Sequence, residues 1–123
     1  MYKDILVGTD GSATARIAVD RAVDVAKSAG ARLTVVSVGR PDKAGKVVEA
    51  EATRLADAGV DVRTKTVDGD PSSGLLQEVE EGGYDLLVVG NKGMTGASRF
   101  FLGSVPNKVS HHVQRSLLIV RTT

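Results

Sequence analysis

The sequence contains no cysteine, so neither disulfide bonds nor thiolate metal sites stabilise the fold. This absence is consistent with a reducing compartment. Aromatic residues are scarce too: two tyrosines, two phenylalanines and no tryptophan leave little material for stacking on nucleic-acid bases. The formal net charge of +1 gives no dedicated basic surface for a phosphate backbone. We therefore expect no nucleic-acid partner.

Long hydrophobic runs are absent as well. The longest apolar segments, such as residues 86–89 and 117–120, are far shorter than the ~20 residues that a membrane helix needs. The first residues lead directly into a strand-like segment and contain no apolar stretch of signal-peptide length. We expect a cytoplasmic protein with no membrane partner.

Carboxylates are missing from the last third of the chain. All 15 acidic residues lie at or before Asp85. Basic residues continue after it, and these are Lys92, Arg99, Lys108, Arg115 and Arg121. Two interpretations remain open: the asymmetry arises by chance, or this part of the chain faces an anion.

Strand-like and helix-like segments alternate along the chain. Runs of β-branched and aliphatic residues predict strands at residues 5–7, 33–38, 60–67, 86–89 and 117–120. Ser12 and Gly30 are good boundaries for a first helix, Gly59 closes a second, Asp70 followed by proline opens a third, and Ser104 opens a fourth. The expected buried faces of the second and fourth helices are Val48, Ala52, Leu55 and Ala56, and Val105, Val109 and Val113, respectively.

This alternation predicts an α/β fold, a single doubly wound sheet of five parallel strands covered on both faces. Residues 60–67 alternate charged with apolar side chains, which is typical of an edge strand. A flavodoxin-like or adenine-nucleotide-hydrolase-like strand order of 3-2-1-4-5 fits the patterns, although the patterns alone do not fix it. We expect residues 1–123 to form one domain.

Ligands of such sheets bind beyond the carboxyl ends of the strands, where the chain direction switches. Two segments meet this description: residues 8–12, which hold Gly8, Thr9 and Asp10, and residues 90–104, which begin with Gly90 and Asn91. The second connection is far longer than the usual 2–6 residues. Its glycines permit close backbone approach to a ligand, and its end at a helix N-terminus favours an anion. The alternatives are a phosphate site and an ordinary glycine-rich loop.

The chain lacks the two commonest nucleotide motifs. No Walker sequence occurs, and the first strand is not followed by a dinucleotide fingerprint. The spacing Gly90-x2-Gly93-x9-Gly103-Ser104 instead resembles the Gly-x2-Gly-x9-Gly-Ser/Thr motif of the ATP-binding branch of the universal stress protein family. Residues 5–12 and 104–120 look like that family too, so the resemblance spans nearly the whole chain.

The resemblance implies roles for individual residues. Asp10 would lie beside the ribose, and the backbone of Val38 would meet adenine. The residues implied in holding the ribose and phosphates are Gly90, Gly93, Gly103, Ser104 and the backbone of Val105. ATP would arrive with Mg²⁺, since the sequence shows no metal-binding constellation of its own.

Several of these residues have simpler explanations. Asp10 could cap a turn, and Ser104 could cap the fourth helix as well as donate to phosphate. We interpret His112 as a packed helix residue and His111 as a surface one. Phe100 and Phe101 more simply anchor the loop than stack on adenine. We assign no catalytic residue.

The implied function is an ATP-binding, nucleotide-responsive stress or regulatory module. The alternatives are a slow ATP hydrolase or phosphotransferase using the same loop, a dimeric stress protein that binds no nucleotide, and an FMN site, for which the chain has few flanking aromatics. The last strand, from Ser116 to Arg121, has no charge inside it and would form an exposed edge. We expect a symmetric homodimer through that strand, as the resemblance also implies.

Overall fold

Strands and helices alternate along the chain in an α/β fold. The computed structural model describes residues 1–92 and 102–122. The elements are β1 (Asp4–Gly8), α1 (Ala13–Ala29), β2 (Arg32–Val38), α2 (Pro41–Arg54), β3 (Val62–Val67), α3 (Pro71–Glu81), β4 (Leu86–Gly90), α4 (Ser104–His112) and β5 (Ser116–Val120). The strands form one parallel sheet in the order β3-β2-β1-β4-β5, which confirms the predicted order.

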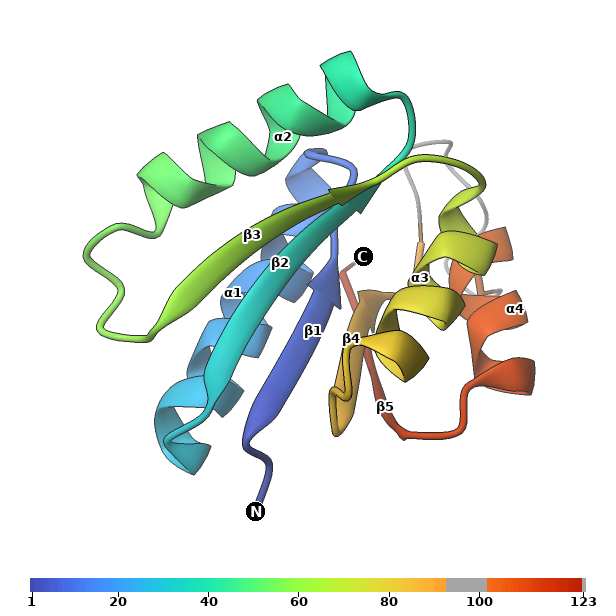
Figure 1. Ribbon diagram of the computed structural model, residues 1–123. Helices are drawn as coiled ribbons and strands as arrows, with labels where there is room; N and C mark the ends of the chain where they lie inside the picture. Colours follow the sequence, from blue (N-terminus) through green and yellow to red (C-terminus); the bar gives the residue numbers. More distant parts are fainter. Residues whose placement is uncertain (93–101, 123) are drawn as a thin grey trace.

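Helices cover both faces of the sheet. α1 and α2 lie on one face, and α3 and α4 lie on the other (Figure 1). The middle of the central strand β1, residues 5–7, is apolar because it contributes to both layers: Ile5 and Val7 pack toward α1, and Leu6 packs in the layer of α3 and α4. All three side chains are completely buried. A strand buried on both faces has no need of polar alternation.

The helix boundaries follow local chemistry that the sequence already displays. The Ser12 hydroxyl accepts a hydrogen bond from the Ala15 N–H at 3.1 Å and caps α1. α1 stops at Gly30, whose φ of 65° lies in the left-handed region that glycine adopts without strain. Asp70 accepts from the Ser73 N–H at 3.0 Å and caps α3. These boundary predictions are confirmed.

α2 differs from the prediction in both length and orientation. It ends at Arg54, before Gly59, and Ala52 is exposed rather than buried. The stripe that faces the sheet contains Glu51 instead, which is 2% exposed. A sequence pattern that assigns only apolar residues to the core cannot place a glutamate there. Val48 and Leu55 are buried as predicted, whereas Ala56 is exposed like Ala52, so the predicted face is correct in part.

Glu51 occupies an apolar position because its charge is paired. Its Oε2 accepts hydrogen bonds from Arg54 Nε at 2.9 Å and Nη2 at 2.6 Å, and Arg16 Nε lies 3.7 Å from Oε1. Arg54 also donates to Asp20 at 2.6 Å. Because Arg16 and Asp20 belong to α1, this network joins the two helices of one face.

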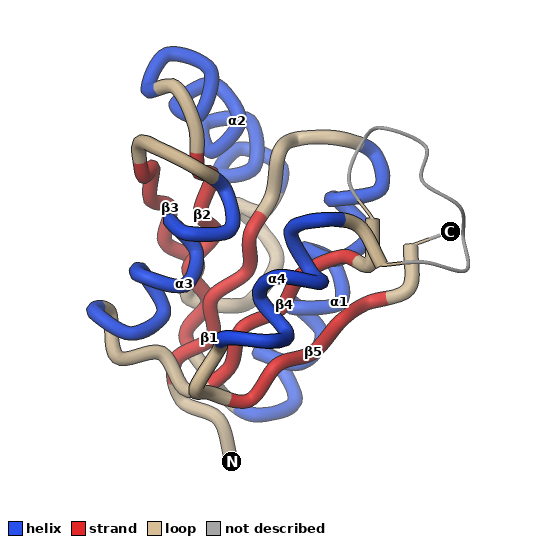
Figure 2. The backbone as a smooth tube through the Cα atoms, turned by 90° about the vertical axis from the view of Figure 1, so that its right-hand side faces the viewer, coloured by secondary structure: helices blue, strands red, loops and turns tan. Residues whose placement is uncertain are grey.

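The sheet has two different edges (Figure 2). β3 is mostly exposed and carries Arg63 and Lys65, whereas the apolar middle of β5, residues 117–119, is half-buried. β3 begins at Val62, two residues later than predicted. β1 lies between β2 and β4, with Val7 paired in register to Val35 and Val88. The connections from β1 and β4 therefore leave the sheet side by side, at its topological switch point.

Within residues 1–92 and 102–122, no helix combines the length and apolar character needed to cross a membrane.

Candidate functional site

A cleft of about 400 Å³ lies at the carboxyl end of the sheet, at the switch point between β1 and β4. The ends of β1, β2 and β4 and the first turns of α3 and α4 enclose it. Most of the predicted site residues line it, namely Gly8, Thr9, Asp10, Val38, Gly90, Gly103, Ser104 and Val105. Asn91 does not line it, and Gly93 lies outside the described residues.

One wall of the cleft is apolar. Val36 and Val38 from β2, Leu75 from α3 and Val89 from β4 contribute to it, with Pro71 at the start of α3. Sequence reasoning identified Val38 from the family resemblance and missed the other four. Their positions fit ordinary core patterns, so no local signal distinguishes a side chain that lines a cleft from one that fills a core.

The turn after β1 holds Asp10 at the rim of the cleft. The Asp10 carboxylate accepts a hydrogen bond from the Ser12 N–H at 2.9 Å, and the Thr9 hydroxyl accepts from the Gly11 N–H at 3.0 Å. Gly11 has a φ of 82°, which residues with a Cβ rarely adopt. Asp10 is exposed, so it both braces the turn and remains accessible from the cleft.

The glycines at the ends of β1 and β4 are explained by packing within the protein. A Cβ on Gly8 would lie 2.9 Å from Leu75 Cδ2, and a Cβ on Gly90 would lie 3.3 Å from Thr122 Cγ2. Both distances are shorter than ordinary carbon contacts. We expected that these glycines are needed so that a ligand can approach the backbone closely. Packing against Leu75 and Thr122 is a second reason for glycine at both positions.

α4 begins at the cleft without a side-chain cap. Its N-cap is the buried Gly103, and Ser104 is the first helical residue, so the prediction that Ser104 caps the helix is wrong. Glycine has no side chain that can accept from the first turn, whereas Ser12 and Asp70 cap α1 and α3. The N–H groups of Ser104 and Val105 therefore suit an external acceptor, and the helix dipole favours an anionic one.

The two residues that directly follow β4, Asn91 and Lys92, are buried next to the start of α4. Lys92 is 6% exposed and is the basic residue among those that line the described part of the cleft. Asn91 is 8% exposed, and its side chain accepts from the N–H and the hydroxyl of Thr122. Its backbone carbonyl accepts from the Gly103 N–H at 2.8 Å. Asn91 thus supports the cleft from behind instead of lining it.

The remaining candidates contribute little to the described cleft. Val109 is buried in α4 as expected, with Val105 and Val113 half-buried. His111 and His112 are both exposed, so the predicted packing of His112 is wrong. Arg99, Phe100 and Phe101 lie outside the described residues. Within the described ranges, no three His, Asp or Glu side chains come together as a metal site would require.

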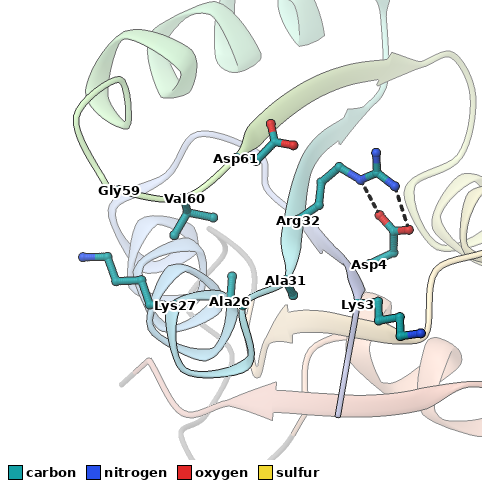
Figure 3. A pocket seen from close by; sticks show the side chains of 10 residues that line it. Lys3, Asp4, Ala26, Lys27, Ala31, Arg32, Gly59, Val60 and Asp61 are labelled. Carbon is teal, nitrogen blue, oxygen red and sulfur yellow. Dashed lines mark hydrogen bonds and ion pairs between the residues drawn. The ribbon is translucent and has the colours of Figure 1, made fainter.

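A second hollow, of about 560 Å³, lies at the opposite end of the strands from the cleft (Figure 3). Arg32 donates to both oxygens of Asp4 there, at 2.8 and 3.0 Å, so these two charges satisfy one another. This pairing holds the pKa of the Asp4 carboxyl below its ordinary range. Lys3, Lys27 and Asp61 complete a rim of mixed sign. The charges of this hollow are therefore mixed and partly paired, and it lies at the amino ends of β1 and β2, away from the switch point.

The fold and the cleft together define a doubly wound α/β protein with a cleft at its switch point, the position where ligands of such sheets generally bind. The model of the universal stress protein family matches residues 1–121, and the chain belongs to that family. It is 32% identical to universal stress protein YxiE of Bacillus subtilis (strain 168), over 98% of this chain and 100% of that protein.

Solved structures agree with this assignment. A universal stress protein in complex with cAMP is 35% identical, with a TM-score of 0.85 over 99% of this chain and 98% of that one. Protein Rv1636 from Mycobacterium tuberculosis H37Rv is 39% identical, with a TM-score of 0.68 over 99% of this chain and 97% of that one. The α/β architecture is therefore that of its family.

Proposed function

We propose that the cleft binds an adenine nucleotide, with ATP and Mg²⁺ as the first candidate ligand. In this proposal the protein is a cytoplasmic regulatory module whose state depends on whether the cleft is occupied. The observation that carries it is the division of the cleft into two parts. Val38 and Leu75 offer an apolar surface for the base, and the glycine-capped start of α4 offers two backbone donors for phosphate.

The charges of the cleft support the same ligand. Lys92 and Asp10 are the charged residues among those that line its described part. Lys92 favours a phosphate, and the rim carboxylate of Asp10 is placed to accept hydrogen bonds from a ribose hydroxyl. Because the described residues hold no cluster of metal ligands, Mg²⁺ would be bound mainly by the phosphates and water.

A cyclic nucleotide is a second candidate ligand. A relative that is 35% identical was crystallised with cAMP. ATP and cAMP share the adenine base, which the apolar wall would bind, and the ribose 2′-hydroxyl, from which Asp10 could accept a hydrogen bond. cAMP lacks a free 3′-hydroxyl and presents less charge to α4 than ATP does. Binding of ATP should therefore depend on Lys92 and Mg²⁺ more strongly than binding of cAMP does.

The direct test is to denature freshly purified protein and identify any released nucleotide. The emptied protein is then titrated calorimetrically with ATP, AMP and cAMP, each with Mg²⁺ and with a chelator. The same titrations on Gly103→Val, which places a branched side chain at the start of α4, should show much weaker binding. If no nucleotide is released and none binds at millimolar concentration, the proposal fails.

We propose binding without rapid turnover. Hydrolysis needs a positioned water, a base and a group that stabilises the transferred charge. Asp10 and Lys92 are the charged candidates in the described cleft. ATP turnover that is lost in Asp10→Ala or Lys92→Ala while ATP binding persists would favour the alternative of a slow hydrolase or phosphotransferase.

We also propose that two copies pair through β5. This strand forms one edge of the sheet, and its apolar residues 117–119 are half-buried in the single chain. An uncharged edge of this kind favours pairing with another strand, and antiparallel pairing about a twofold axis would cover both copies. Sedimentation of the protein at micromolar concentration should give a dimer. A species of 12.8 kDa alone would contradict this arrangement.

A further inference from the structure

Asn91 connects three segments that are far apart in the sequence. It follows β4, and its N–H donates to the carbonyl of Val120 at 2.9 Å. Its side-chain Oδ1 accepts from the N–H of Thr122 at 2.8 Å and from the Thr122 hydroxyl at 2.9 Å. Its own carbonyl accepts from the Gly103 N–H at 2.8 Å. The end of β5 and the start of α4 are thus attached to one residue.

These contacts are buried, which makes them specific. Asn91 is 8% and Thr122 9% exposed. A buried amide oxygen that accepts two hydrogen bonds is held in one orientation, and leaving either donor without an acceptor is costly. Neither residue lines the cleft, whereas Gly103 does. A change at Thr122 can therefore reach the cleft through Asn91 without touching a ligand.

We infer that Asn91 is a positioning residue, which transmits the placement of Thr122 to Gly103 and thereby sets the affinity of the cleft for a nucleotide phosphate. This inference rests on the proposed nucleotide-binding function. Gly103 fixes where the first N–H groups of α4 lie, and a displacement of a few tenths of an ångström weakens hydrogen bonds to a phosphate. The end of the edge strand and the phosphate end of the cleft are accordingly coupled.

The variant that isolates this coupling is Thr122→Val. It removes the hydroxyl that donates to Asn91 and keeps the N–H and a branched side chain against Gly90. Thr122→Ser restores the hydroxyl. Tyr84→Phe is a matched control, since it also removes a buried hydroxyl donor, here to Glu78 at 3.2 Å, at a position that does not line the cleft.

The first measurement needs no nucleotide. Amide hydrogen exchange of the ligand-free protein should show the Gly103 N–H exchanging several-fold faster in Thr122→Val than in the wild type. Exchange should return to the wild-type rate in Thr122→Ser and stay unchanged in Tyr84→Phe. An unchanged Gly103 rate in Thr122→Val overturns the inference whatever the protein binds.

The second measurement is nucleotide affinity. Thr122→Val should bind the nucleotide identified above about three- to tenfold more weakly. This factor corresponds to the free energy of about one hydrogen bond between the start of α4 and the phosphate. Thr122→Ser should recover wild-type affinity, and Tyr84→Phe should retain it. Wild-type affinity in Thr122→Val overturns the inference and leaves the proposed function standing. Absence of binding by the wild type overturns both.

Discussion

Glu51 Oε2 lies 2.6 Å from Arg54 Nη2, although Glu51 occupies the apolar stripe of α2 and is 2% exposed. The Arg54 side chain is 29% exposed, so one partner of the pair is buried and the other remains in contact with water. A buried charge of this kind is tolerated only while its partner is present.

Arg54→Met should therefore destabilise the protein. The variant removes the closest partner of the Glu51 carboxylate, which remains buried. We therefore expect the free energy of unfolding to fall by about 3 kcal/mol. Urea denaturation measures this value. The double variant Glu51→Leu/Arg54→Met should recover most of the loss, because it removes the buried charge as well. Equal losses in the single and double variants would contradict this explanation.

The carboxyls of Asp4 and Asp70 should make the free energy of unfolding fall in acid. The side-chain hydrogen bond from Arg32 lowers the pKa of Asp4, and the Ser73 N–H lowers the pKa of Asp70. A carboxyl whose folded-state pKa is depressed contributes stability above its unfolded pKa of about 3.9, and this contribution disappears as the pH falls through the folded pKa.

The test of this pH dependence is thermal unfolding of Asp4→Asn and Asp70→Asn across the acid range. The melting temperature of each variant should lie below that of the wild type at neutral pH. The difference should shrink as the pH falls below ~4, because the carboxyls of the unfolded chain bind protons there first and those of the folded wild type follow at lower pH. A difference that stays constant down to pH ~2 would show that the carboxylate charge is not the cause.

Gly74→Ala should disturb both stability and the cleft. A Cβ at Gly74 would lie 2.5 Å from Cγ1 of Val38, a residue of the apolar wall. We expect a loss of about 1–3 kcal/mol from overpacking and weaker nucleotide binding, because Val38 or α3 must shift. Gly45→Ala is the control: nothing lies within 4 Å of its Cβ, and helix propensity should stabilise it by about 0.5–1 kcal/mol.

Ser104→Pro should remove the backbone N–H donor at the start of α4 while leaving the helix in place. Proline suits the first helical position and removes the N–H there together with the serine hydroxyl, and the extended ψ of 168° at Gly103 is compatible with a following proline. Loss of a donor to phosphate should weaken nucleotide binding about tenfold with little change in stability. Ser104→Ala keeps the N–H and should bind more tightly than Ser104→Pro. Equal affinities would show that the backbone donor is not used.

The sequence predicts the features that depend on local chemistry. Ser12, Gly30 and Asp70 determine helix ends through their own side chains or φ values, and the unbroken apolar run of β1 indicates burial on both faces. Alternating charge in β3 correctly indicates an edge. These signals indicate the fold class and one edge of the sheet. The observed strand order and switch point are compatible with them, but the patterns alone do not fix either.

Features that depend on distant partners could not be predicted. Glu51 is buried in an ion-pair network that extends from its local partner Arg54 to Arg16 on another helix, and the sequence pattern does not show that contact. Leu75 lines the cleft because Gly8, far earlier in the chain, leaves room for it. In the sequence, Asn91 is a polar residue in a glycine-rich connection. Its structural role becomes visible only through its contacts with Thr122 and Gly103.

The position of β1 between β2 and β4 makes the cleft a product of the whole chain. The turn after β1 contributes residues 8–10 to the cleft and the start of α4 contributes residues 102–105, so no short contiguous fragment carries both. Release of the nucleotide and unfolding of the protein would then be linked, since a ligand that binds only the folded chain raises its stability by RT ln(1 + [L]/Kd). A cell short of that nucleotide would hold a chain that opens more often, and proteolytic lifetime would follow the supply of ligand.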